Sequence, residues 1–101
     1  KNSLNYIVHL AAQAGVRYSL INPYSYMENN VIAYLNILEC LKNKKKNIKI
    51  IYASSSSVYG KGNGLLNEYN DTNKPIQLYA VSKKTNELII VDLIKLHKLV
   101  Y

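Results

Sequence analysis

The chain has 101 residues, which is enough for one small domain and too short for two. Thirteen Lys and Arg residues against six Asp and Glu residues give a formal net charge of +7 at pH 7. No run approaches the roughly 18 consecutive apolar residues that a membrane-spanning helix needs, and no signal peptide opens the sequence. The one cysteine, Cys40, cannot form an internal disulfide, so the sequence favours a reducing, cytoplasmic location.

The lysines are dispersed except for a cluster at residues 42–46. This cluster falls at the end of an expected helix, where cations suit the helix dipole, and we interpret it as a solvated helix end. A nucleic-acid-binding patch is the less favoured alternative, and we expect no nucleic-acid partner. Cys40 lies within the same helical pattern and is expected to be a small buried residue.

Apolar periodicity predicts five elements in chain order. Residues 6–10 form a short apolar run that ends in Ala11 and Ala12, which predicts a strand, and residues 13–22 form a loop. Pro23 suits the first turn of a helix, and apolar side chains then recur at helical spacing from residue 24 to about residue 43.

The second half repeats this order. Residues 48–53 predict a buried strand, followed by a long loop from residue 54 to about residue 76 with three glycines and Pro75. A loop of this length in a small domain is usually functional. A second helix is expected over residues 77–96, and the chain is extended from Leu99.

The order strand, helix, strand, helix, strand predicts an α/β fold: part of a doubly wound, Rossmann-like parallel sheet with right-handed crossovers. Ligands bind such sheets outside the carboxyl ends of the strands. Small residues stand at both expected ends, Ala11 and Ala12 after the first strand, and Ser54 and Ser55 after the second. Two such ends on one rim suit a flat cofactor ring lying against backbone.

Three residues near this rim have the chemistry of an alcohol oxidation. Tyr79 and Lys83 are four residues apart on the second helix and therefore share one face. An ammonium beside a phenol favours the phenolate, so Lys83 is expected to prepare Tyr79 for acid/base catalysis at a hydroxyl that becomes a carbonyl. A serine hydroxyl from the run at residues 54–57, just past the second strand, could bond the same substrate oxygen.

Four motifs occur in one order: HLAAQAGVRYS at residues 9–19, NNV at 29–31, YASSSSVYG at 52–60 and LYAVSKK at 78–84. Together they resemble the extended short-chain dehydrogenase/reductases. Within that superfamily the chain is most similar to the nucleotide-sugar 4-epimerases, and to UDP-glucuronate 4-epimerases in particular. The resemblance covers nearly the whole chain.

The resemblance implies a bound NAD that takes a hydride from C4 of a UDP-sugar and returns it to the other face. It implies that Tyr79 is the acid/base, that Lys83 also holds the nicotinamide ribose, and that Ser55 is the catalytic serine. It also assigns cofactor and substrate contacts. The implied cofactor residues are Leu10, Ala11, Ala12, Asn30, Ala53, Ser54, Tyr79 and Lys83, and the implied substrate residues are Arg17, Ser55, Ser56 and Ser57. No metal is implied.

The serine run separates branches of the superfamily. Nucleotide-sugar 4,6-dehydratases carry Thr-Asp-Glu where Ser55, Ser56 and Ser57 stand, and the decarboxylating relatives usually keep a glutamate in this triplet. Both remain alternatives to the epimerase, but three hydroxyls without a carboxylate fit a reaction that leaves C5 and C6 untouched.

One family feature is missing from the sequence. No set of glycines here follows a first strand with the spacing of the fingerprint that seats the pyrophosphate. We therefore expect residues 1–101 to be the central part of an NAD-binding domain, without the fingerprint and without the C-terminal substrate region, and inactive alone. A non-catalytic binding or assembly module is the remaining alternative. In either case the resemblance implies a homodimer formed through the two helices.

Overall fold

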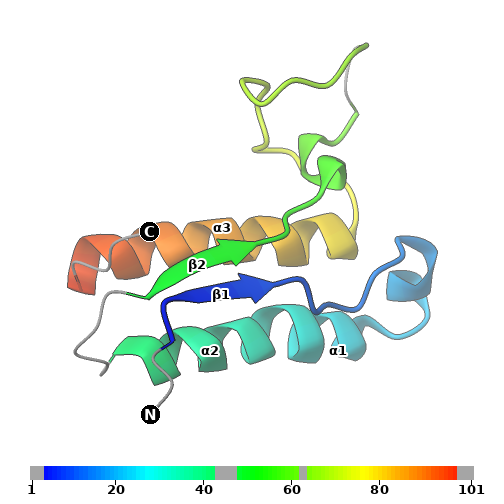
Figure 1. Cartoon of the computed structure of the whole chain (residues 1–101). Helices are drawn as coiled ribbons and strands as arrows, with labels where there is room; N and C mark the ends of the chain where they lie inside the picture. Colours follow the sequence, from blue (N-terminus) through cyan, green and yellow to red (C-terminus); the bar gives the residue numbers. More distant parts are fainter. Residues whose placement is uncertain (1–3, 43–47, 62–63, 98–101) are drawn as a thin grey trace.

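A computed structural model of the chain describes residues 4–42, 48–61 and 64–97, with side chains described up to residue 92 in the last helix. Two strands, β1 (Tyr6–His9) and β2 (Lys49–Tyr52), lie side by side in a parallel sheet (Figure 1). Their register pairs Tyr6 with Lys49 and His9 with Tyr52. The predicted parallel α/β arrangement is therefore confirmed. The extended segment expected from Leu99 lies outside the described residues.

The helical segment after β1 is built from several short pieces. A 3-10 turn, η1 (Arg17–Leu20), precedes α1 (Pro23–Tyr26), and a π-helical stretch, η2 (Met27–Ile32), leads into α2 (Ala33–Lys42). Asn22 caps α1 by accepting a hydrogen bond from the backbone N–H of Ser25, and a proline follows it at the first helical position. The predicted helix exists, but the sequence pattern did not predict its π-helical turn.

The third helix, α3 (Leu78–His97), packs beside α2 on the same face of the sheet. The core joins Tyr34 and Leu38 of α2 to Ile90 of α3, and partly buried side chains of β2 complete it. The ring of Tyr34 lies between two others, with centroids 5.4 Å from His9 and 5.3 Å from Tyr52. Burial of an apolar core side chain such as Leu38 or Ile90 stabilises the fold by roughly 1.5–3 kcal/mol.

Burial alternates along both strands, as the two-residue period of a strand requires. The side chains facing the helices are half-buried, whereas Tyr6, Val8 and Ile51 on the other face are exposed. Cys40 is exposed on α2, so the expectation that it is buried was wrong. The apolar side chains of α2 that enter the core are Tyr34, Leu38 and Leu41, and Cys40 lies off that stripe.

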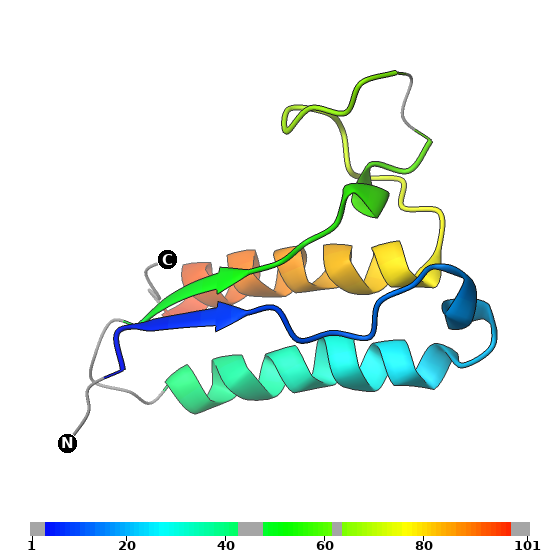
Figure 2. The ribbon, with the colours of Figure 1, turned by 45° about the vertical axis from the view of Figure 1, so that its right-hand side comes forward.

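The long connection from β2 to α3 extends away from the carboxyl end of the sheet (Figures 1 and 2). It begins with a 3-10 turn, η3 (Ser56–Tyr59), which Ser55 caps. Gly60 ends this turn with φ of 64°, a conformation that L side chains rarely adopt. A Cβ atom at Gly60 would collide with the backbone carbonyl of Lys74, so the two arms of the loop approach each other closely at this residue.

Candidate functional site

Lys83 ties α3 to the carboxyl end of the sheet. Its side chain is buried, with 5% of the residue exposed, and its Nζ donates a hydrogen bond to the carbonyl of Ala53 at 2.8 Å. Ala53 follows β2 directly, two residues before Ser55. The structure therefore brings Lys83 to the strand end that carries the serine run.

Burial also lowers the pKa of this lysine and of a neighbouring histidine. Desolvation holds the pKa of Lys83 below its ordinary value, because the charged form loses water in the interior. The pKa of His9 is also lowered, first by desolvation and then by the positive charge of Lys83. The Lys83 ammonium thus acts at both strand ends: it bonds Ala53 after β2 and affects His9 at the end of β1.

The four serines after Ala53 have different surroundings. The Ser55 and Ser57 hydroxyls share a hydrogen bond at 2.8 Å, and the backbone N–H of Ser57 donates to Ser55 Oγ at 3.2 Å. Ser54 instead donates to Glu87 on α3, while Ser56 is exposed. Only Ser55 and Ser57 therefore form a directly bonded pair.

Tyr79 lies one helical turn before Lys83, on the same face of α3. Its ring contacts the ring of Tyr26 edge to face, with centroids 6.1 Å apart. The hydroxyl of Tyr26 donates to the carbonyls of Ala14 and Gly15 in the loop after β1. This buried tyrosine links the first loop to the candidate acid/base.

Asn30 holds the same loop from within the π-helical turn. Its Oδ1 accepts from the backbone N–H of Gln13 at 2.7 Å, and its Nδ2 donates to the Gln13 carbonyl at 3.1 Å. The same amide donates to Ser82 Oγ at 3.0 Å, and Ser82 in turn donates to the carbonyl of Tyr79. One buried asparagine therefore positions both the loop after β1 and the backbone of Tyr79.

The remaining predicted ligand contacts lie on accessible backbone. Leu10 and Ala11 are exposed just past β1, while Ala12 and Ala53 are half-buried. Arg17 is exposed in η1, at the far end of the first loop. Small or exposed residues at the ends of both strands leave room for a flat ring, which is what the predicted cofactor assignment requires.

A cavity of about 540 Å³ opens between the serine run, the long loop and α3. Ser54, Ser55 and Ser56 line one side, and Glu87 lines the side formed by α3. Of the described residues, Tyr79 and Lys83 are not in its wall. Of the three candidate catalytic residues, this cavity therefore includes Ser55 alone, while Lys83 reaches the same end of the sheet through Ala53.

Sequence reasoning missed several supporting residues. Ser82 and Asn86 are fully buried on the face of α3 that carries Tyr79 and Lys83, and Asn86 Nδ2 donates to the carbonyl of Asn30 at 2.7 Å. The spacing of these four residues, i, i+3, i+4 and i+7, was a readable signal of one shared helix face. Tyr26 gave no such signal.

Among the described residues, no helix combines the length and apolarity needed to cross a membrane. No group of three or more His, Cys, Asp or Glu side chains in these same segments is arranged to hold a metal ion.

Comparison with known proteins identifies the family. The family model described as GDP-mannose 4,6 dehydratase matches residues 1–101. The chain belongs to this family. Within it, the chain is 49% identical over 85 residues to Protein CapI of Staphylococcus aureus, covering 82% of the chain and 25% of that protein. It is 44% identical over 88 residues to UDP-glucuronate 4-epimerase 4 of Arabidopsis thaliana, covering 86% of the chain and 20% of that protein.

Solved structures of related proteins share the fold of this chain. The UDP-N-acetylglucosamine 4-epimerase of Methanobrevibacter ruminantium M1 matches with a TM-score of 0.84 at 35% identity, covering 94% of this chain and 30% of that one. A mutant UDP-glucuronic acid 4-epimerase of Bacillus cereus, solved with NAD and a fluorinated UDP-sugar, matches with a TM-score of 0.83 at 31% identity and the same coverages. The chain spans about a quarter of the length of the curated relatives it matches.

Proposed function

We propose that the whole protein containing this chain is an NAD-dependent nucleotide-sugar 4-epimerase. The observation that carries the proposal is the hydrogen bond from Lys83 Nζ to the carbonyl of Ala53. It joins the helix that carries Tyr79, one turn before Lys83, to the strand end two residues before Ser55. The matched relatives and structures named as UDP-sugar 4-epimerases support the same activity.

The residues at the strand ends fit NAD. Leu10 and Ala11 are exposed, Ala53 is half-buried, and the buried ammonium of Lys83 lies at the same rim, where a ribose hydroxyl could accept a hydrogen bond from it. When bound, NAD supplies the acceptor and donor of a hydride.

The side chains of this chain would manage the proton and orient the sugar. Tyr79 would take the proton from the C4 hydroxyl as C4 is oxidised and return it after the sugar has turned over. Ser55 would donate a hydrogen bond to the same sugar oxygen, and Lys83 would stabilise negative charge on the Tyr79 oxygen. Ser56 and Ser57 would bond other sugar hydroxyls, and Arg17 would meet a phosphate or carboxylate of the substrate.

The serine run argues for epimerisation over dehydration. Expelling a C6 hydroxyl requires an acid, and removing the C5 proton requires a base. Ser55, Ser56 and Ser57 provide neither. Glu87 does place a carboxylate on the wall of the neighbouring cavity, but that carboxylate already accepts hydrogen bonds from Ser54 and Lys84.

We infer UDP-glucuronate as the substrate, because relatives named UDP-glucuronate 4-epimerase match most of the chain. A basic side chain at Arg17 is compatible with a substrate that carries a carboxylate. Pairing of two copies through the helices is part of the same proposal, and exposed apolar side chains on α3, such as Leu88, are available for it.

Replacing Tyr79 by Phe tests the function. In the whole protein, Tyr79→Phe removes the proton acceptor but keeps the ring that packs on Tyr26, so kcat is expected to fall by at least about 100-fold with NAD still bound. Proton NMR of the product from UDP-glucuronate measures turnover and identifies the sugar formed. Turnover comparable to that of the unsubstituted protein would end the assignment. Tyr24→Phe, which removes an exposed phenol on α1, is the matched control and should leave kcat unchanged.

A further inference from the structure

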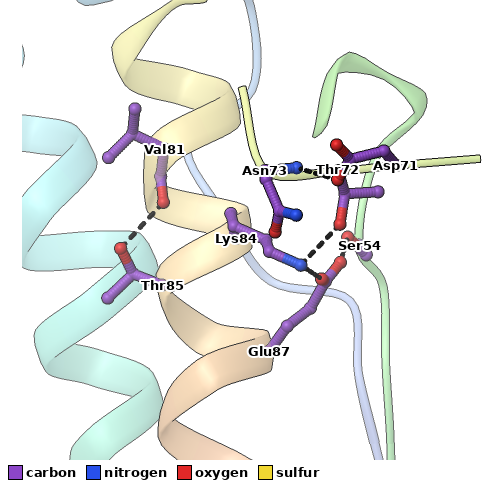
Figure 3. A network of polar contacts seen from close by, with 8 residues as sticks. All are labelled: Ser54, Asp71, Thr72, Asn73, Val81, Lys84, Thr85 and Glu87. Atoms are coloured by element: carbon purple, nitrogen blue, oxygen red, sulfur yellow. Dashed lines mark hydrogen bonds and ion pairs between the residues drawn. The ribbon is translucent and has the colours of Figure 1, made fainter. Parts of the chain in front are cut away.

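A chain of polar contacts joins three separate segments beside the serine run (Figure 3). Ser54 Oγ donates to one oxygen of Glu87 at 2.6 Å, and Lys84 Nζ contacts the other oxygen at 3.0 Å. The same Nζ donates to Thr72 Oγ1 at 2.5 Å. The end of β2, one face of α3 and the returning part of the long loop are therefore connected through one ion pair.

This ion pair is better shielded than the other one described in the chain. The side chains of Lys84 and Glu87 are 20% and 26% exposed, whereas those of Lys42 and Glu39 on α2 are 35% and 52% exposed and 3.3 Å apart. Charges that have lost part of their water interact more strongly, and hydrogen bonds to ionised groups are the strong ones. We therefore expect the Lys84–Glu87 pair to be the stronger ion pair and to hold Ser54 and Thr72 through its hydrogen bonds.

Both ends of the network lie in the connection between β2 and α3. Ser54 is exposed, and its peptide leads directly into Ser55, which is extended before the η3 turn begins. At the other end, the backbone N–H of Asn73 donates to Asp71 Oδ1 at 2.8 Å and forms a tight turn around Thr72. The contact from Lys84 holds this turn against α3.

We propose that Glu87 is a positioning residue for Ser55. Lys83 and His9 already hold Ala53 at the strand end. The Glu87 carboxylate fixes the next residue, Ser54, and thereby helps to set where the Ser55 hydroxyl lies relative to α3, which also carries Tyr79 and Lys83. Through Lys84 and Thr72, the same carboxylate holds the returning part of the loop, residues 70–76, next to the serines. The inference rests on the proposed function, because the placement of Ser55 affects turnover only if Ser55 contacts the substrate.

The experiment compares Glu87→Ala, Glu87→Gln and Ser54→Ala in the whole protein, with Glu39→Ala as the matched control, since Glu39 forms an i,i+3 pair with Lys42 on the other helix. Misplacement of a catalytic group by about 1 Å can cost about 100-fold in rate, so Glu87→Ala should lower kcat by about 10- to 100-fold. KM should change much less. Glu87→Gln keeps an acceptor for Ser54 and should recover part of the loss.

A double variant separates positioning from general destabilisation. If Glu87 acts through Ser54, the combined Ser54→Ala/Glu87→Ala variant should have the same kcat as Glu87→Ala alone. The reason is that each substitution removes the same hydrogen bond between Ser54 and Glu87. Losses that multiply would overturn the proposal, as would a kcat for Glu87→Ala equal to that of Glu39→Ala. If Glu87→Ala fails to fold, Glu87→Gln and Ser54→Ala carry the same comparison.

Amide hydrogen exchange provides a second measurement that does not depend on activity. Glu87→Ala should speed exchange in residues 54–59 and 70–76, and Glu39→Ala should not. Unchanged exchange in both segments refutes the network, whatever the enzyme does. Faster exchange in a protein that converts no nucleotide sugar would instead keep the network and refute the proposed function.

Discussion

His9 shows how one buried lysine affects a neighbouring residue at the ends of the two strands. Its ring stacks on Tyr34 beneath the sheet, and its pKa is lowered first by burial and then by the charge of Lys83. In a pH window below 6.5 the unfolded chain therefore binds more protons at this residue than the folded chain does. Stability from this source is present above that window and is lost as the pH falls through it.

We therefore expect the free energy of unfolding of the whole protein to fall as the pH is lowered below 6.5, and His9→Gln to reduce that fall. Urea unfolding of both proteins at several pH values measures the difference. NMR titration of the His9 ring gives an independent check, and a ring that titrates at or above 6.5 would contradict the argument. Lys83→Met should raise the His9 pKa, because it removes the second of the two causes.

At the scale of residues, the sequence was sufficient to place Lys83 but not to predict its partner. Helical spacing showed that Tyr79 and Lys83 share a face, and the packing of α3 on the strand end then brought the lysine to Ala53. The Glu87 network could not be predicted in the same way. Its contacts join residues 54, 72, 84 and 87, and the fold of the long loop, which no periodic pattern describes, decides which of them meet.

At the scale of elements, the π-helical stretch η2 is the feature that most affects the site. It carries Asn30, whose side chain holds Gln13 and Ser82, while the Asn30 carbonyl accepts a hydrogen bond from Asn86. Single π-helical turns within longer helices frequently occur at functional sites. The sequence pattern missed this turn because apolar periodicity does not indicate which carbonyl each backbone N–H bonds within a single turn.

Removing the bond from Asn86 should destabilise the protein. Asn86→Ala leaves the buried carbonyl of Asn30 without this donor, which should cost about 1–3 kcal/mol of unfolding free energy. Asn30→Ala keeps that carbonyl but removes the three side-chain hydrogen bonds to Gln13 and Ser82, so it should cost more than Asn86→Ala. Urea denaturation measures both. The exposed Asn36 supplies the control, and a loss for Asn36→Ala as large as that for Asn86→Ala would contradict this account.

At the scale of the whole molecule, the helices in the described part of the chain cover one face of the two-stranded sheet. Tyr6, Val8 and Ile51 remain exposed on the other face of the described sheet. The alternation of strand and helix was enough to predict the parallel pairing, because short parallel strands joined by a helical crossover have few other arrangements. It could not predict which face each helix covers, because both strands are apolar at almost every position.

The 101-residue chain by itself is expected to bind NAD weakly or not at all. The sequence lacks the glycine fingerprint that seats the pyrophosphate on a helix N-terminus. A ligand at free concentration L stabilises a protein by RT ln(1 + L/Kd), so millimolar NAD should leave the melting temperature of the chain unchanged if the Kd lies far above millimolar. The whole protein, measured beside it, should show a shift. A clear shift for the chain alone would refute the expectation.

The small size of Gly60 determines how closely the two arms of the long loop can approach each other. The outgoing arm after η3 and the returning arm at Lys74 meet where this residue has no side chain, and a single added methyl group would strike the opposing carbonyl. Any larger residue at position 60 would therefore push the two arms of the loop apart. The close contact between the two arms of the loop thus depends on a hydrogen atom that stands in place of a carbon.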